Sequence, residues 1–91
     1  MSDTSLKLYV VSGTYLSERA VVAAQRLRDH LPDGATLEVV DVLAHPEIAE
    51  SERIIATPML VRVSPDPVRR IVGDLSDLDR VRWALGLGAG A

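Results

Sequence analysis

The segment Ile54-Ile-Ala-Thr-Pro-Met-Leu-Val-Arg-Val63 separates the two halves of the chain. Pro58 has a fixed φ and no amide hydrogen, so the element before it is expected to end there. The run 59–63 is almost entirely apolar and is therefore predicted to be a strand. A tight Ser64-Pro-Asp-Pro67 connection leads from this run to Val68-Arg-Arg-Ile-Val72. Together the two runs predict a β-hairpin.

The N-terminal half has the pattern of a strand, a helix and a second strand. Residues 6–11 and 36–42 are rich in β-forming side chains and are predicted to be strands. Between them, apolar residues recur at helical spacing at Leu16, Ala20, Ala23, Ala24, Leu27 and Leu31. Ser17 is a candidate N-cap, and Pro32-Asp-Gly34 is expected to end the helix. A unit of this kind predicts two parallel strands joined by a right-handed crossover.

Two further helices are predicted on either side of the hairpin. Pro46 suits the first position of a short helix that covers residues 47–53. Ser76 and Asp79 form a capping-box-like start for a final helix over residues 77–85. The resulting order of elements is β-α-β-α-β-β-α, which belongs to the α/β class.

Length and composition indicate one small globular domain. The 91 residues are 47% hydrophobic and 25% charged, which is ordinary for a globular protein. We expect a single domain over residues 1–91 that is ordered over about 5–87, with a frayed glycine-rich tail after it.

Composition also excludes several classes of function. The chain has no cysteine, which removes disulfides, thiolate metal sites and thiol redox chemistry. The net charge is −3, and the ten basic residues are scattered apart from Arg69-Arg70, so nucleic acid is not an expected partner. No apolar run approaches membrane-spanning length or resembles a signal segment, so we expect a cytoplasmic protein with no membrane partner.

Catalytic and metal-binding constellations are not expected. Ser12, Thr14 and Ser17 are candidate nucleophiles, but each would need an activating base, and the two histidines lie elsewhere in the sequence. We interpret His30 as a favourable charge at a helix C-terminus and His45 as a capping residue. The carboxylates form two clusters, Glu47, Glu50 and Glu52, and Asp74, Asp77 and Asp79, and both clusters are expected at helix starts. We therefore expect no catalytic residue, no metal site and no cofactor.

The order of elements, with Thr57-Pro58 directly before the third strand, resembles the thioredoxin fold. Redox members of that fold carry two cysteines after the first strand, where this chain has Ser12-Gly-Thr-Tyr-Leu-Ser17. The resemblance predicts a mixed four-stranded sheet and a cis peptide bond before Pro58, although only about 5–6% of such bonds are cis in folded proteins. Along the fourth strand, Arg69 and Arg70 are expected to point to opposite faces.

A second resemblance covers nearly the whole chain, from residue 6 to about residue 87. Its most specific part is the run Pro67-Val-Arg-Arg-Ile-Val-Gly-Asp-Leu-Ser-Asp77. It also includes Leu6-Lys-Leu-Tyr-Val10, Ser17-Glu-Arg-Ala20, Asp41-Val-Leu43, Pro46-Glu-Ile-Ala-Glu50 and Ile54-Ile-Ala-Thr-Pro58. These residues resemble the KaiB family of circadian-clock proteins. The KaiB-like sensor domain of the clock histidine kinase is similar in the first strand and the Ala-Thr-Pro element, but less so in residues 69–77.

The KaiB resemblance implies a non-enzymatic adaptor. In a thioredoxin-like state, KaiB proteins dock on the first ATPase ring of KaiC, sequester KaiA and compete with the sensor kinase. In a second state their C-terminal half refolds and they form tetramers. The family usually carries basic residues on the face that meets KaiC, and the matching positions here are Val22, Gln25 and Glu38. This loss of positive charge implies that the binding partner can differ from the one that the family usually binds.

Of the two KaiB states, we expect the thioredoxin-like one. Residues 77–85 form a continuous helical pattern, with Ala84 where the family often has glycine. The glycine-rich tail after this helix contains few residues that favour a strand. The alternative is the ground-state KaiB fold with its refolded C-terminal half. In the expected state the protein is predicted to be a monomer or a weak homo-oligomer.

Three functions follow as hypotheses. The first is a KaiB-like adaptor that binds a KaiC-type ATPase ring and modulates its phosphorylation and timing output, with a KaiA-like protein as a further partner. Its predicted interface comprises Arg19, Thr36, Glu38 and the exposed edge of the second strand. The second is a sensor module for a histidine kinase, or a stress-response protein. The third is a degenerate thioredoxin-fold binder of peptides or glutathione, which predicts a pocket beside the Ser12-Gly13 turn and Pro58.

Overall fold

The computed structural model describes residues 3–54 and 56–87. Its elements in chain order are β1 (Ser5–Val10), α1 (Tyr15–Arg28), β2 (Thr36–Asp41), α2 (Pro46–Ser51), β3 (Met59–Ser64), β4 (Arg69–Val72) and α3 (Leu78–Ala84). The four strands form one sheet in the order β2-β1-β3-β4. β1 and β2 are parallel, whereas the β1–β3 and β3–β4 pairs are antiparallel. The predicted mixed four-stranded sheet and the predicted order of elements are therefore confirmed.

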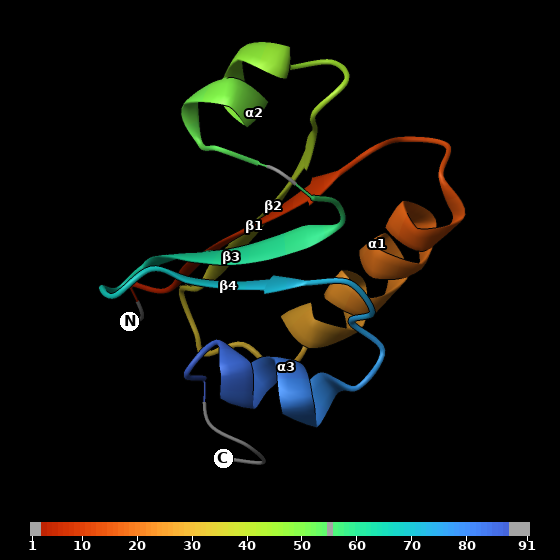
Figure 1. Cartoon of the computed structure of the whole chain (residues 1–91). Coiled ribbons are helices and arrows are strands. Elements are labelled where there is room, and N and C mark those ends of the chain that lie inside the picture. The colour runs from red at the N-terminus through yellow and green to blue at the C-terminus, as the bar shows by residue number, and fades with distance from the viewer. Residues whose placement is uncertain (1–2, 55, 88–91) are drawn as a thin grey trace.

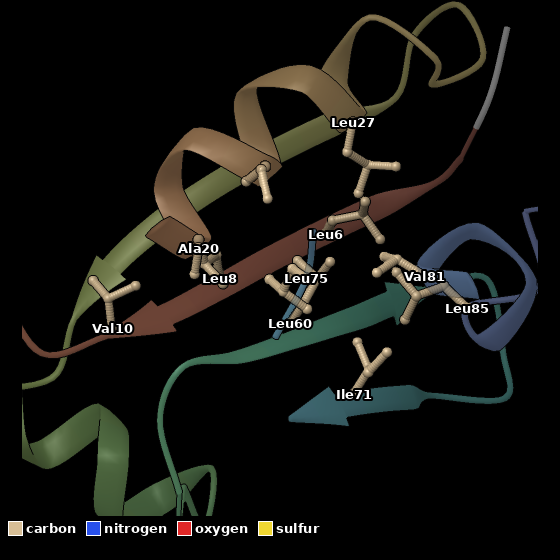
Figure 2. Close-up of a cluster of buried hydrophobic side chains, with 12 residues drawn as sticks. Leu6, Leu8, Val10, Ala20, Leu27, Leu60, Ile71, Leu75, Val81 and Leu85 are labelled. Carbon is tan, nitrogen blue, oxygen red and sulfur yellow. The ribbon is translucent and has the colours of Figure 1, made fainter. Parts of the chain in front are cut away.

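The two faces of the sheet are covered unequally (Figure 1). α1 and α3 pack on one face, and the short α2 lies on the other side, near one end of the strands. The larger core lies under α1 and α3, where side chains such as Leu6, Leu8 and Leu60 of the central strands meet Leu27 and Val81 of the helices (Figure 2). A fully buried leucine of this kind stabilises the fold by about 1.5–3 kcal/mol.

The smaller core lies under α2. It consists of Tyr9, Val40, Met59 and Val61, with Ile48 and other aliphatic side chains packed against it. Three alanines of α1, Ala20, Ala23 and Ala24, are buried against the opposite face. Because alanine is small, α1 can lie close to the sheet without any large aromatic side chain between the layers.

The start of α1 differs from the predicted one. The helix begins at Tyr15, and the residue in the N-cap position is Thr14, whose hydroxyl donates a hydrogen bond to the carbonyl of Val11 at 2.8 Å. Ser17 is buried, and its hydroxyl oxygen accepts a hydrogen bond from the amide of Val11 at 3.0 Å. Ser17 is therefore not the N-cap but joins the end of β1 to the first turn of α1.

Both ends of α3 are defined by local hydrogen bonds. The predicted N-cap, Ser76, is wrong by one residue, because the carboxylate of Asp77 accepts the amide hydrogen bond of Arg80 at 3.1 Å. At the other end Gly86 has a φ of 71°. The amides of Gly86 and Leu87 donate to helix carbonyls at 3.0 and 2.8 Å. This is the pattern of a Schellman motif, which requires a left-handed residue at the position of Gly86.

A buried arginine holds α3 against the hairpin. Arg62 on β3 is only 6% exposed. Its Nη1 donates to the carbonyl of Leu85 at the end of α3, and its Nη2 donates to the carbonyl of Pro67 in the β3–β4 connection, both at 2.8 Å. A cation at a helix C-terminus is favourable because the unpaired carbonyls carry partial negative charge. Arg62 thus links three segments of the C-terminal half.

The remaining backbone predictions can be compared directly. The Thr57–Pro58 bond is cis, as predicted, and the bonds before Pro65 and Pro67 are cis as well. The described chain ends with α3 and the Schellman turn, and no strand follows that helix up to residue 87. The rest of the predicted tail, 88–91, lies outside the described residues.

Arg69 and Arg70 lie on opposite faces of β4, as expected. The Nε atom of Arg69 is 3.3 Å from the position that a Cβ on Gly86 would take, on the α3 side. Arg70 lines a hollow with Tyr9 on the other side of the sheet. Both arginines are exposed.

Candidate protein-binding surfaces

The turn after β1 is where redox-active thioredoxins carry their cysteines. Here the Ser12 hydroxyl donates a 2.6 Å hydrogen bond to a carboxylate oxygen of Asp41. This bond, together with one from the amide of Leu43, lowers the pKa of Asp41 below its usual value. A cavity of about 360 Å³ lies beside Ser12 and Gly13. Pro58, which was expected to border such a pocket, does not line it.

His45 and several of the clustered carboxylates lie at or beside the ends of helices. His45 occupies the N-cap position of α2 but makes no capping hydrogen bond, and its Nδ1 lies 3.6 Å from a carboxylate oxygen of Glu47. Glu47 is in the first turn of α2, as predicted, whereas Glu50 and Glu52 lie at its end. Asp74 accepts a hydrogen bond from the Ser76 amide before α3. Within residues 3–54 and 56–87, no three histidine or acidic side chains form a group that could hold a metal ion.

The described helices also bear on membrane contact. The longest, α1, has 14 residues, and none in the described part of the chain is long and apolar enough to cross a membrane.

A groove between α1 and the start of α3 contains one of the predicted interface residues, Arg19. The groove has a volume of about 350 Å³, and Tyr15, Val22, Arg26 and Leu78 also line it. The guanidinium of Arg19 lies over the Tyr15 ring, 5.7 Å from its centre, which is a cation–π distance. Tyr15 is 71% and Val22 is 50% exposed. The groove therefore presents an aromatic ring, an aliphatic side chain and two arginines to solvent.

The other two predicted residues, Thr36 and Glu38, lie on the edge strand β2. Both are exposed. Their side chains share a face with Val40 of the smaller core, because alternate residues of a strand point the same way. They therefore face away from α1. The intervening Val39 is 43% exposed. The amides of Thr36 and Val42 donate hydrogen bonds to carbonyls of the β1 segment. Because the backbone groups of successive strand residues point to alternate sides, the N–H and C=O of Val39 point away from β1, outward from the sheet edge.

The structure thus divides the predicted interface between two surfaces. Arg19 contributes to the lowered pKa of Asp74 near α3, which places it on the helix-covered side. Glu38 contributes to the raised pKa of Tyr9, which lies in the smaller core on the opposite side. A partner could contact all three residues only by wrapping around the β2 edge. Which residues make the contact stays a prediction.

Sequence reasoning missed several exposed side chains that suit protein binding. Trp83 is 74% exposed, and the helical spacing that directs Val81 and Leu85 into the core is the signal that would have placed Trp83 outward. Exposed Tyr15 follows in the same way from buried Ser17 and Ala20. Aromatic residues of this kind are enriched at binding hot spots.

Comparison with solved structures defines the fold class. The N-terminal domain of SasA from Synechococcus elongatus is 24% identical, with a TM-score of 0.72 over 100% of this chain and 90% of that one. Chloroplastic thioredoxin z is 14% identical, with a TM-score of 0.75 over 93% of this chain and 80% of that one. Thioredoxin from Trichomonas vaginalis is 17% identical, with a TM-score of 0.67 over 91% of this chain and 77% of that one. The chain therefore has a thioredoxin-like fold without the redox cysteines.

Comparison of sequences defines the family. The KaiB domain model matches residues 7–87. The circadian clock oscillator protein KaiB of Prochlorococcus marinus (strain MIT 9313) is 46% identical over 83 residues, which are 90% of this chain and 70% of that protein. The protein of the same name from Microcystis aeruginosa is 45% identical, over 90% of this chain and 80% of that protein. The chain belongs to the KaiB family of circadian clock proteins, and the resemblance seen in the sequence is confirmed.

Proposed function

We propose that this chain is a non-enzymatic, cytoplasmic adaptor that binds a KaiC-type ATPase ring and modulates the ring's phosphorylation and timing output. The observation that carries this proposal is the match to the KaiB family over residues 7–87. The thioredoxin-like arrangement supports it, because this is the state in which the family resemblance implies docking. In this state the protein acts as a monomer or a weak homo-oligomer, and a KaiA-like protein is a further partner.

The interface that we propose comprises Arg19, Thr36, Glu38 and the exposed edge of β2. The outward N–H and C=O groups of Val39 offer an edge to which a partner strand can add. Glu38 places a negative charge where relatives are expected to be basic. Charge at the rim of an interface acts mainly on the association rate.

The decisive experiment is capture of partners from lysate of the source cells with ATP present. An ATPase of the KaiC type in the bound fraction supports the proposal. A histidine kinase without an ATPase supports the sensor-module alternative, which the SasA-like fold favours only at the level of architecture.

A charge exchange at Glu38 tests the interface itself. If the partner surface is acidic, Glu38→Lys accelerates association with the purified ATPase by up to about tenfold at low salt, and the acceleration disappears at high salt. Asp33→Lys makes the same change in net charge in the exposed turn before β2 and serves as the matched control. Equal effects of the two variants would remove Glu38 from the interface.

The cavity beside Ser12 and Gly13 favours the peptide- or glutathione-binding alternative. Titration with reduced glutathione, followed by amide chemical shifts, separates it from the adaptor proposal. The adaptor proposal predicts no saturable shift at the amides of Ser12 and Gly13. Saturable shifts there would establish a small-molecule site instead.

A further inference from the structure

The sheet face opposite α1 and α3 is only half covered. α2 lies over the end of the sheet where Val40, Tyr9 and Met59 are buried (Figure 1). Farther along the strands the same face carries Lys7, which is half-buried, and Arg70, which is exposed. This second half of the face has no helix over it among the described residues.

Strand register places the uncovered side chains in a row. Lys7 of β1 pairs with Glu38 of β2 on one side and with Val61 of β3 on the other. Val61 in turn pairs with Arg70 of β4. Because neighbouring strands are about 4.8 Å apart, the backbones at Lys7 and Arg70 lie roughly 10 Å from each other, with Val61 between them.

A hollow of about 90 Å³ lies on this row. Its walls are mostly aliphatic and come from Ile54, Val61, Val63 and Val68, and its charged members are Lys7, Arg70 and Glu52. Pockets for cofactors and drug-sized ligands are typically about 300–1,000 Å³. The hollow is therefore too small for such a ligand, but it suits a single side chain inserted by a partner.

Tyr9 supplies a hydrogen-bond donor to the hollow. The residue is only 2% exposed and lines the hollow. Its hydroxyl has no hydrogen-bond partner within residues 3–54 and 56–87, and it is not among the fully occluded polar atoms there. Burial and the negative charges of Glu52 and Glu38 raise the pKa of the Tyr9 phenol, and the positive charge of Arg70 opposes them. The hydroxyl thus reaches solvent through the hollow, close to a cation.

The two cations of the hollow are available to a ligand. The ion pairs within the described residues are His45–Glu47 and Arg82–Asp79, so neither Lys7 nor Arg70 has a carboxylate within 4.0 Å there. Glu52 also lines the hollow, so its lining residues carry one net positive charge, while the exposed Glu38 lies outside the hollow beside Lys7. Two cations, a phenol donor and aliphatic walls complement a carboxylate on an aliphatic stem.

We propose that this hollow binds the side-chain carboxylate of an acidic residue that a partner protein presents between apolar residues. The carboxylate lies between Lys7 and Arg70 and accepts a hydrogen bond from the Tyr9 hydroxyl. The apolar residues on either side of this acidic residue in the partner cover Val63 and Val68. This inference rests on the proposed protein-binding function but does not depend on the partner being an ATPase ring.

Amide chemical shifts of the whole ¹⁵N-labelled chain test the site directly. The probe is the blocked peptide Ac-Leu-Glu-Leu-NH₂, and the control is Ac-Leu-Gln-Leu-NH₂. The glutamate peptide is expected to give saturable shifts at Lys7, Tyr9, Val61 and Arg70, and the glutamine peptide is not. Tyr9→Phe, which keeps the ring, weakens binding about fivefold, and Arg70→Gln weakens it about tenfold. Arg26→Gln removes an exposed arginine in the groove beside α1 and leaves binding unchanged.

Several results would overturn the proposal. They are an equal response to both peptides, no saturable shift from either, or shifts that move to the α1–α3 groove. Identical shifts with inorganic phosphate would show a general anion site. Concentration-dependent shifts of the same amides without peptide would show that a second copy of the chain covers the face. Failure of the peptide to bind, with intact capture of an ATPase, would refute this site and leave the proposed function standing.

Discussion

Gly86→Ala should destabilise the protein by about 2–4 kcal/mol, which is more than the addition of one methyl group suggests. A left-handed backbone costs a non-glycine residue about 1–2 kcal/mol, and the stiffer unfolded chain offsets about 0.4–1 kcal/mol of this. The new Cβ would also lie 2.7 Å from Nη1 of Arg62, which must then move. Because that nitrogen donates to the Leu85 carbonyl, the movement loses a charged hydrogen bond, which is worth about 1.5–3 kcal/mol.

The structure provides a matched control in Gly13→Ala. Gly13 has a φ of 88°, and no atom lies within 4 Å of the Cβ position. Only the backbone contribution of about 1 kcal/mol therefore applies to this variant. The difference in free energy of unfolding between the two variants therefore isolates the cost of the collision with Arg62, because the cost of the left-handed conformation is common to both.

Urea denaturation followed by far-UV circular dichroism measures both free energies of unfolding. For a domain of this size, 1 kcal/mol corresponds to about 4–8 °C in Tm, so thermal melts should separate the two variants clearly. In an Arg62→Met background, Gly86→Ala should cost no more than Gly13→Ala. If Gly86→Ala and Gly13→Ala agree within about 0.5 kcal/mol in the wild-type background, the role assigned to Arg62 is wrong.

Three further predictions concern caps and titrating groups. Asp77→Ala should cost about 1 kcal/mol of stability because it removes the N-cap of α3, whereas Glu50→Ala, at an exposed site without an ion pair among the described residues, should change the melting temperature little. The Asp41 carboxyl should titrate below the usual aspartate pKa. Its stabilising effect is therefore present above the usual aspartate pKa and is lost as the pH falls through the lower pKa of the folded state. Ser12→Ala removes a hydrogen bond to the carboxylate and should raise the Asp41 titration midpoint measured by carboxyl NMR. The Tyr9 phenol should titrate above its usual pKa of 10.0, so its contribution to stability is present below pH 10 and is lost at higher pH. Ultraviolet absorbance should show one late-titrating tyrosine in the wild type and none in Tyr9→Phe. If the wild type shows no late-titrating tyrosine, the burial assigned to Tyr9 is wrong.

Much of the fold could be predicted because its signals are local. Helical spacing identified α1 and α3, and the apolar run after Pro58 identified β3. Cap positions were less accurate, because Ser17 has a hydroxyl that bonds to the end of β1 and not to its own helix. Local pattern alone could not reveal that Arg62 is buried. Its position is stable because α3 and the hairpin bring two carbonyl oxygens to it.

The candidate interface was harder to predict than the fold. Arg19 was correctly expected to be exposed, but local pattern did not tell whether Thr36 and Glu38 lie on the face of the sheet that α1 covers. That choice decides whether Arg19 lies beside Thr36 and Glu38, and the structure places it on the other side. The hollow beside Tyr9 is lined by residues of β1, β3 and β4, so its position depends on the register of three strands. No single segment of the sequence encodes that register.

The incomplete cover of the sheet also affects how this chain can evolve. A change at a side chain beneath α1 or α3, such as Leu60, disturbs a core and costs about 2–5 kcal/mol when the side chain is truncated to alanine. Exposed positions such as Glu38 and Arg70 on the uncovered half change stability by only about 0.5 kcal/mol. Substitutions on that half can therefore accumulate without loss of folding, so relatives with the same backbone can diverge in what they recognise.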